Sequence, residues 1–157
     1  MIALKFKPID LARHQAICLR FEADMEACNS GDGSEDAERG ALFLDKIAAK
    51  LANDPQSCLH AWHAGEIVGQ LHLGRFFDET VGYVHFFYVA PAWRGTGVAA
   101  QLDAYALRHF TERGYSVARL SVMLGNRRAH RFYRRQDWKD LEPRADKPGA
   151  IAMERSF

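Results

Sequence analysis

A strand pattern that runs into a glycine turn and then into a helix pattern most constrains how this chain can fold. Residues 81–89 are mostly apolar and aromatic, and Gly95 and Gly97 follow them; apolar side chains then recur at helical spacing over residues 98–110. A helix that begins in this way leaves its first backbone N–H groups without partners, and its macrodipole adds partial positive charge there. Because glycines lack side chains, a phosphate can approach this backbone closely. The pattern therefore predicts an anion cradle, best suited to a diphosphate.

Other nucleotide-binding motifs fit this turn less well. No Gly-Lys-Ser/Thr follows it, so the turn is not a P-loop. It is also a poor dinucleotide fingerprint, because the last glycine of G-x-G-x-x-G falls on Ala100 when the first is Gly95. A tight strand-to-helix turn without a ligand is the alternative interpretation.

The remaining periodicity predicts an α/β fold with the element order βααβββαβαβ, a largely antiparallel start and one β-α-β unit. Ser34 is the expected cap of the second helix, and Ala64-Gly65 is a hairpin-sized link. The residues between the last helix and the final strand are expected to form an irregular tail, because they include Pro143, Pro148 and Gly149. Strands are expected at residues 2–6, 57–63, 66–75, 81–89, 115–124 and 150–157, and helices at 10–21, 35–52, 98–110 and 126–136.

Length and composition are those of an ordinary globular protein of one domain, with 157 residues, of which 48% are hydrophobic and 26% charged. The net charge of +1 argues against a general nucleic-acid binder. It hides an asymmetry, since residues 1–90 carry 8 Lys/Arg and 13 Asp/Glu, net −5, whereas residues 91–157 carry 13 and 7, net +6. A split of this kind points to partners rather than to a fold.

The sequence predicts neither a membrane segment nor a metal site. Its start lacks the apolar stretch of a signal peptide, and no run of about 18 apolar residues could span a bilayer. The three cysteines, Cys18, Cys28 and Cys58, lack C-x-x-C spacing, which favours a reducing, cytoplasmic setting. In a strand, Cys58 and His60 would share a face while His63 points away, so this densest His/Cys cluster is a poor tetrahedral site.

Two further motifs accompany the glycine turn. The turn reads Arg94-x-x-Gly97-x-Ala99; further along come Asn126-x-x-Ala129-x-x-Phe132-Tyr133 and the closing Met153-Glu154-Arg155. Together with the element order, these strings resemble the GNAT superfamily of acyl-CoA-dependent N-acetyltransferases, whose first signature is R/Q-x-x-G-x-G/A. The resemblance covers essentially the whole chain and is strongest over residues 83–138. It implies a single-domain fold with a mixed, mostly antiparallel central sheet and helices on both faces, and transfer of an acetyl group from acetyl-CoA to an amine.

The resemblance also implies where acetyl-CoA would bind. Its diphosphate would rest on the backbone N–H groups of residues 95–100, and its pantetheine arm would pair with the strand at 87–89. The N–H of Val89 would donate to the thioester carbonyl, which becomes an oxyanion in the tetrahedral intermediate; one such donor is typically worth about 3 kcal/mol. The implied cofactor-binding residues are Phe87, Tyr88, Val89, Arg94, Gly95, Thr96, Gly97, Val98, Ala99, Ala100, Asn126, Ala129 and Tyr133.

Tyr133 is the general acid that the resemblance implies for the departing thiolate. Asn126, Ala129 and Tyr133 fall at i, i+3 and i+7 and so share one helix face, where the small Ala129 leaves room for the cofactor arm. Proton transfer from a phenol to a thiolate is uphill by roughly 2 kcal/mol. Hydrogen-bond donation, or a tyrosine acidified by neighbouring positive charge, is therefore expected. A core aromatic with its hydroxyl at the rim is the alternative.

The base that would deprotonate the amine departs from the family pattern. The acidic residue that is familiar on the strand before the cradle is missing, since His85 and Phe86 occupy that place. His85 is the leading base, because strand alternation puts it on the same face as Val89 and its pKa suits the task. Asp78, Glu79 and a water chain are the alternatives.

The predicted helix at 126–136 carries five arginines and ends in a second departure. Asp137-Trp138 stands where the family commonly has Gly-Phe, so a residue that tolerates left-handed backbone less well occupies the turn. The arginines form a solvated basic face, or some of them bind the 3′-phosphate of CoA, because guanidinium groups suit phosphate oxygens. They are Arg127, Arg128, Arg131, Arg134 and Arg135.

Acidic side chains crowd the segment that the family uses to hold the acceptor. They form a solvated loop, or a collar that attracts a cationic amine such as a polyamine, an aminoglycoside or a Lys-bearing peptide. The first function expected is N-acetylation of a small-molecule amine, with a protein acceptor or a non-catalytic acyl-CoA-binding module as alternatives. No nucleic-acid or membrane partner is expected, and a homodimer is left open. The collar residues are Glu22, Asp24, Glu26, Asp32, Glu35, Asp36 and Glu38.

Overall fold

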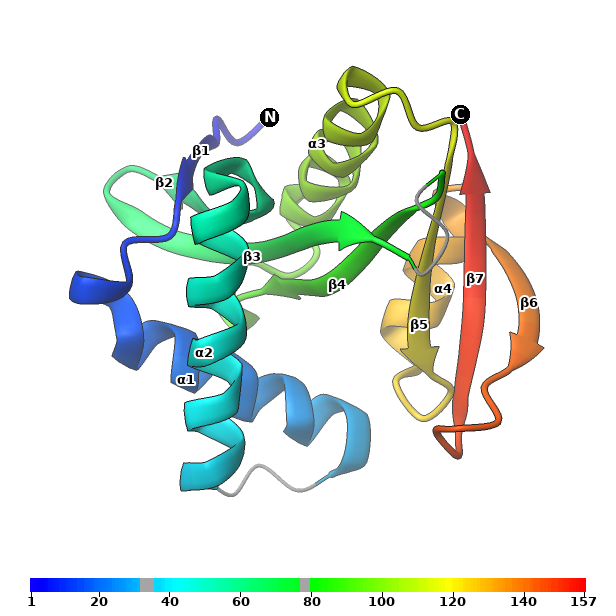
Figure 1. The fold of residues 1–157 in the computed structure, drawn as a ribbon, viewed down its shortest axis with the longest axis horizontal. Helices are drawn as coiled ribbons and strands as arrows, with labels where there is room; N and C mark the ends of the chain where they lie inside the picture. Colours follow the sequence, from blue (N-terminus) through cyan, green and yellow to red (C-terminus); the bar gives the residue numbers. More distant parts are fainter. Residues whose placement is uncertain (32–35, 77–79) are drawn as a thin grey trace. The chain divides into compact units, whose positions relative to one another are not determined.

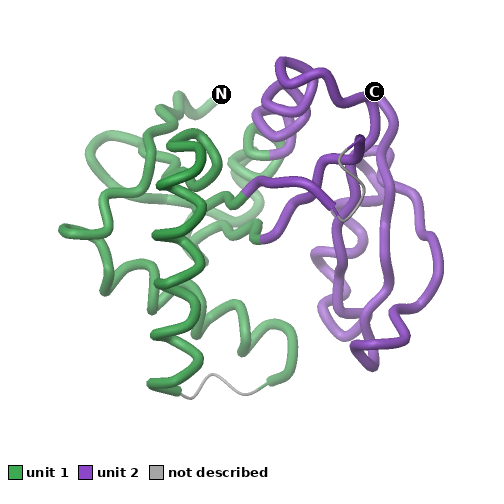
Figure 2. Tube along the Cα trace, viewed as in Figure 1, with its two compact units in different colours: residues 1–72, 86–102 green, residues 73–85, 103–157 purple. Residues whose placement is uncertain are grey.

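The computed structural model describes residues 1–31, 36–76 and 80–157 (Figure 1). The chain forms two compact units, residues 1–72 with 86–102 (unit 1) and residues 73–85 with 103–157 (unit 2; Figure 2). The strands are β1 (Lys5–Pro8), β2 (Cys58–His63), β3 (Glu66–Arg75), β4 (Gly82–Val89), β5 (Val117–Met123), β6 (Lys139–Pro143) and β7 (Ala150–Ser156). The helices are α1 (Leu11–Ser30), α2 (Ala37–Asn53), α3 (Val98–Glu112) and α4 (Arg127–Arg135), with 3-10 turns η1 (Pro55–Ser57) and η2 (Pro91–Trp93).

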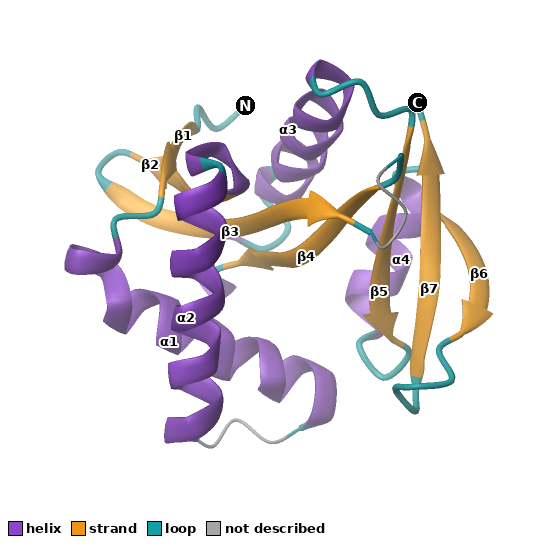
Figure 3. Ribbon diagram, viewed as in Figure 1, coloured by secondary structure: helices purple, strands orange, loops and turns teal. Residues whose placement is uncertain are grey.

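The strands form one sheet of seven in the order β1-β2-β3-β4-β5-β7-β6 (Figure 3). Antiparallel ladders join β1 to β2, β2 to β3, β5 to β7 and β7 to β6. The parallel pair is β4 with β5, in which Gly82 lies opposite Ala118. The prediction of a mixed, mostly antiparallel sheet is therefore confirmed.

In unit 1, alternate residues of β3 and β4 pack against helices on opposite faces of the sheet. Ile67 and Tyr88 form a buried cluster with Phe21 of α1. Val68, the next residue of β3, packs instead with Leu102 of α3. Because both faces are covered, seven successive residues of β3, 67–73, are buried, and the prediction of helices on both faces is confirmed in this unit.

Unit 1 also buries three polar side chains that are hydrogen-bonded in a row, His60, Gln70 and His72. The Nε2 atom of His60 lies 2.7 Å from Oε1 of Gln70, and the amide nitrogen of Gln70 lies 2.8 Å from Nε2 of His72. The amide nitrogen can only donate, so His72 accepts at Nε2 and is neutral. Burial lowers the pKa of His60 to about 4, so this ring is also neutral at pH 7.

Close packing in unit 2 explains a glycine in a strand. The side chains of β5 alternate between half-buried and buried, as expected for a strand with one covered face. Gly82 of β4 lies against the ring of Phe110, which is fully buried on α3. A Cβ atom built on Gly82 would lie only 2.6 Å from Cδ1 of that ring. The position therefore admits no side chain without a shift of the core.

The first two helices differ from the predicted ones at their ends. The first helix begins after Asp10 as predicted, but it continues to Ser30 rather than ending near residue 21. Gly31 ends it with a left-handed backbone (φ 79°) and donates its N–H to the carbonyl of Ala27. Asp36 caps α2 by accepting from the backbone N–H of Arg39 at 3.0 Å. The predicted cap, Ser34, lies outside the described residues.

The two edge strands of the sheet also differ from the predicted ones. The prediction of an irregular tail is wrong for β6, which contains Pro143 and ends the sheet. Proline lacks a backbone N–H, but an edge strand tolerates it because that side of the strand needs no donor. β1 begins at Lys5 rather than residue 2 and forms the opposite edge. Both errors concern edge strands, whose side chains need not alternate between core and solvent.

No helix within residues 1–31, 36–76 and 80–157 is long and apolar enough to cross a membrane. In that same part of the chain, no group of three or more His, Cys, Asp and Glu side chains is arranged to hold a metal ion. None of Cys18, Cys28 and Cys58 forms a disulfide bond. The single-domain organisation stays a prediction.

We expect Gly82→Ala to destabilise the protein by about 1–3 kcal/mol, because the new methyl group overlaps the Phe110 ring. Denaturant unfolding of both proteins measures this cost. Phe110→Leu offers a matched background, since the smaller side chain makes room for the methyl group. The two substitutions should therefore cost less together than the sum of their separate costs. Strictly additive costs would contradict the overlap.

Candidate functional site

Two glycines shape the turn between β4 and α3. The φ angles of Gly95 and Gly97 are 77° and 93°, which L side chains rarely adopt. A Cβ built on either glycine meets no atom within 4 Å, so the space beside the turn is open. Thr96, between them, turns its hydroxyl back to the carbonyl of Trp93. The turn therefore leaves room for a bulky anion at the start of α3, as the predicted cradle requires.

The first turn of α3 packs against the sheet of unit 1 on one side and is exposed to solvent on the other. Val98 and Leu102 are fully buried and hold the helix against the sheet of unit 1. Gln101 donates from Nε2 to the carbonyl of Ile2 at 2.6 Å, which ties the first turn to the chain start. Ala100 faces solvent on the same turn. The first turn of α3 is thus a rigid platform with one exposed side.

Hydrogen bonds within unit 1 hold the side chain of Arg94. Its Nε donates to the carbonyl of Val89 at 2.9 Å, and its Nη2 donates to Asp24 on α1 at 2.8 Å. The guanidinium also lies over the ring of Tyr88, 5.5 Å from the ring centroid. These contacts tie the turn to the strand before it and to α1. The place of Arg94 in the cofactor-binding set stays a prediction.

The end of β4 is fixed by hydrogen bonds within unit 1. The N–H of Ala90 donates to the carbonyl of Val68 at 2.9 Å. The hydroxyl of Tyr88 donates to Asp24 at 2.5 Å. Burial and the Asp24 carboxylate raise the pKa of Tyr88, so its phenol stays protonated. The strand therefore reaches the cradle in a defined conformation, and the binding of a pantetheine arm at 87–89 stays a prediction.

In unit 2, α4 places Tyr133 in the interior. Asn126 caps this helix by accepting from the N–H of Ala129 at 3.3 Å, so its amide side chain has a structural use. Tyr133 is 7% exposed, and its ring lies 6.2 Å from that of Trp138. Burial, followed by the charge of Asp103, raises the pKa of Tyr133. Of the two expected alternatives, this direction favours hydrogen-bond donation by a neutral phenol over a tyrosine acidified by positive charge.

The structure accommodates the second departure from the family pattern. Asp137 adopts the left-handed backbone itself, with a φ of 65°. Its N–H donates to the carbonyl of Arg134, which continues the turn beyond α4. Trp138 then enters the core, and its indole N–H donates to Asp103 at 2.8 Å. The turn that the family makes with glycine is made here by an aspartate, one of the few residue types that visit this conformation.

His85 is an exposed residue of β4, the position predicted for the base. Its ring centroid lies 4.8 Å from that of Tyr83, two residues earlier on the same strand. Exposure leaves the ring open to solvent, as proton exchange requires. Its role as base stays a prediction. The alternatives, Asp78 and Glu79, lie outside the described residues.

The five arginines of α4 are all exposed, but at least one has a partner. Arg134 donates to the carboxylate of Asp140 on β6. His130 lies 2.8 Å from the same carboxylate. These two neighbours, Arg134 first, lower the pKa of Asp140 to about 2. Arg134 therefore has a structural partner, and binding of the 3′-phosphate by Arg127 and Arg128 stays a prediction.

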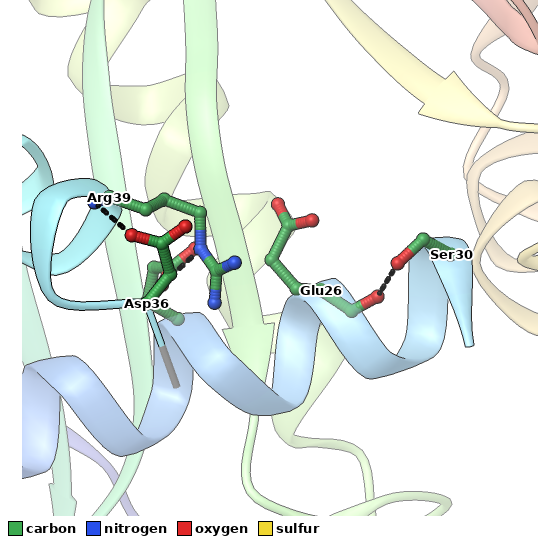
Figure 4. Close-up of polar contacts among 5 residues, drawn as sticks. Glu26, Ser30, Asp36 and Arg39 are labelled. Carbon is green, nitrogen blue, oxygen red and sulfur yellow. Dashed lines mark hydrogen bonds and ion pairs between the residues drawn. The ribbon is translucent and has the colours of Figure 1, made fainter. Parts of the chain in front are cut away.

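The acidic residues of the predicted collar are largely engaged within unit 1. Glu22 is buried and accepts from Nε of Arg39 at 3.0 and 2.9 Å. Figure 4 shows Asp36 at the start of α2, where it accepts from the backbone N–H of Arg39, and Glu26 one helical turn before Ser30 on α1. Asp24 is bound to Tyr88 and Arg94, as described above. Asp32 and Glu35 lie outside the described residues.

These contacts change the interpretation of the acidic segment. Residues 21–38 contain no Lys or Arg, but Arg39 follows them directly and its side chain pairs with Glu22. The pairing of Asp24 with Arg94 joins residues that are far apart in the sequence, so no local pattern could show it. Three of the seven acids thus stabilise unit 1, and arginines offset the charges of two of them, Glu22 and Asp24, which weakens a steering collar.

A sequence model of the Acetyltransferase (GNAT) family matches residues 20–138. The chain is similar to an uncharacterized N-acetyltransferase of Archaeoglobus fulgidus, with 37% identity over 97 residues that cover 59% of this chain and 66% of the relative. It is also similar to the aminoalkylphosphonate N-acetyltransferase of Salmonella typhimurium, with 32% identity over 101 residues that cover 62% of this chain and 66% of the relative. The chain thus spans 66% of the length of each of these two relatives.

The fold is similar to that of the PaiA N-acetyltransferase of Thermoplasma acidophilum, solved in complex with coenzyme A. The TM-score is 0.75 at 14% identity, over 99% of this chain and 100% of that one. At this identity the likeness concerns the fold alone. The match of the family model, in contrast, extends over most of the chain and includes the glycine turn and α4. This chain therefore belongs to the GNAT acetyltransferase family.

Proposed function

We propose that this protein transfers the acetyl group of acetyl-CoA to a primary amine, and more narrowly that this amine belongs to a small molecule rather than to a protein. The observation that carries it is the open glycine turn at the start of α3, where Gly95 and Gly97 leave space beside the backbone. A diphosphate fits such a helix start through backbone N–H groups and the helix dipole. Family membership supports the same ligand.

The chain's own residues have limited and separate roles in this proposal. The N–H groups of residues 95–100 bind the diphosphate, and the N–H of Val89 polarises the thioester carbonyl that acetyl-CoA supplies. Tyr133, neutral because of its burial, donates a hydrogen bond that stabilises the departing thiolate. His85 accepts the proton of the attacking amine, directly or through water.

The relative in Salmonella typhimurium supports a small acceptor, since its name describes an aminoalkylphosphonate N-acetyltransferase. A small primary amine can reach the thioester without the long binding groove that a peptide would need. The acidic composition of this segment favours a cationic amine. The fold weakens that argument, because Glu22, Asp24 and Asp36 have partners within unit 1. The free thiols fit a cytoplasmic compartment, which we propose as the location.

Ala100→Glu should weaken acetyl-CoA binding by about tenfold or more, because the new carboxylate would stand on the exposed first turn of α3 and repel the diphosphate. The same carboxylate suits a helix N-terminus, so folding should not suffer. Isothermal titration with acetyl-CoA measures the effect. Ala104→Glu, also exposed and one turn later on α3, is the matched control and should change Kd less. Equal losses in both variants would contradict binding at the cradle.

Tyr133→Phe should lower kcat by about 100-fold and leave the Kd of acetyl-CoA unchanged, because only the hydroxyl that stabilises the thiolate is lost. The assay is release of free CoA with a panel of amines that includes aminoalkylphosphonates, polyamines, aminoglycosides and peptides. Release with the small amines by the wild type supports the proposal. Activity with peptides alone would replace the small acceptor by a protein. Binding of acetyl-CoA without release from any amine would favour a non-catalytic acyl-CoA-binding module.

Replacing Arg127 and Arg128 by glutamine should weaken CoA more than dephospho-CoA, because both side chains are exposed on α4 and guanidinium groups bind phosphate oxygens. Competition of the two ligands against acetyl-CoA gives both affinities. Arg135→Gln removes an exposed charge from the same helix and serves as the comparison. Equal losses for CoA and dephospho-CoA would exclude a contact with the 3′-phosphate.

A further inference from the structure

Asp24 is the point at which α1 meets the turn that leads to the cradle. One oxygen, Oδ2, accepts from the hydroxyl of Tyr88 at 2.5 Å and from Nη2 of Arg94 at 2.8 Å. The side chains of Asp24 and Arg94 are 35% and 21% exposed, so water screens this ion pair only in part. Both hydrogen bonds are charge-assisted, which makes them stronger and more directional than neutral ones.

Arg94 transmits this contact to the backbone of the turn. Its Nε holds the carbonyl of Val89 at 2.9 Å, and its own N–H bonds to the carbonyl of Pro91 at 3.3 Å. Gly95 follows directly, and its N–H lies in the peptide plane that it shares with the carbonyl of Arg94. Since glycine has little conformational preference of its own, the direction of this N–H depends on how firmly Arg94 is held.

We propose that Asp24 is a positioning residue for acetyl-CoA binding, acting through Arg94 on the N–H groups at the start of the cradle. This inference rests on the proposed function. Asp24 acts through Arg94 and needs no contact with the cofactor. It fixes the guanidinium, which in turn fixes the strand end at Val89 and the peptide that leads into Gly95. Binding then avoids the entropy of ordering the turn, which an unsupported glycine turn would lose.

The sign of the effect separates this role from simple electrostatics. CoA carries several negative charges, so removing the carboxylate of Asp24 should strengthen its binding if charge repulsion alone mattered. A positioning role predicts the opposite, since the turn loses its support. Arg94→Lys tests the same link from the other side, because a lysine keeps the charge but cannot reach both Val89 and Asp24 with two directed donors.

The experiment measures the Kd of acetyl-CoA by isothermal titration for the full chain, alongside the unfolding midpoint. Asp24→Asn and Arg94→Lys should each weaken binding by about tenfold, and the double variant should be little weaker than either single one. Amide hydrogen exchange at Gly95 and Gly97 should become faster in both single variants, while the unfolding midpoint changes little. Asp45→Asn removes an exposed carboxylate from α2 of the same unit, and its Kd should stay within twofold of wild type.

The outcomes distinguish failure of the proposed function from failure of the positioning role of Asp24. If the wild type binds no acetyl-CoA, the proposed function fails. If the wild type binds acetyl-CoA and Asp24→Asn binds it equally well or more tightly, the positioning role alone is overturned. Losses in the two single variants that add up in the double variant also overturn it, because independent effects do not pass through one ion pair. If Asp24→Asn does not fold, the affinity and amide exchange of Arg94→Lys give the same decision.

Discussion

The left-handed backbone at Gly95 and Gly97 is the constraint on which the candidate site depends. A strand buried on both faces has to pass into a helix whose first N–H groups stay open, and side chains in that turn would occupy the space that an anion needs. Flexibility is the cost of this solution, since glycine restrains the backbone less than any other residue. Arg94 compensates with hydrogen bonds that bind the turn to β4 and to α1.

Buried polar groups explain why several chemically suggestive residues are structural. An unsatisfied polar group in the interior costs about 1–3 kcal/mol, so charged and polar side chains find partners before they become available to a ligand. Glu22 pairs with Arg39, Trp138 with Asp103, and Gln70 with His60 and His72. The acidic segment and the histidine-rich strand therefore contribute much of their polarity to the stability of the units that contain them.

Much of the fold could be predicted from local patterns. Strand alternation at 117–123, the hairpin link at Ala64-Gly65 and the strand that precedes the cradle depend on short-range periodicity, and the structure shows all three. Local patterns did not predict β6, because an edge strand with a proline lacks alternation and forms only once β7 offers it a partner. Local patterns also did not predict the extension of α1 to Ser30. The polar composition of its last turns indicated an earlier end, but the helix continues until Gly31 ends it.

The sequence by itself determined the glycine turn before α3 and the order of the elements as far as α4, because glycine conformation and hydrophobic periodicity are properties of neighbouring residues. The charge split between the two halves was also visible there, with its basic part on the cradle and α4. Only the tertiary structure decided which charges remain for binding. Asp24 reaches Arg94, and Tyr133 is buried beside Trp138 with a raised pKa, because folding brings together residues that no local pattern relates. Ion pairs and desolvation depend on distance and burial in space, and these exist only in the folded chain.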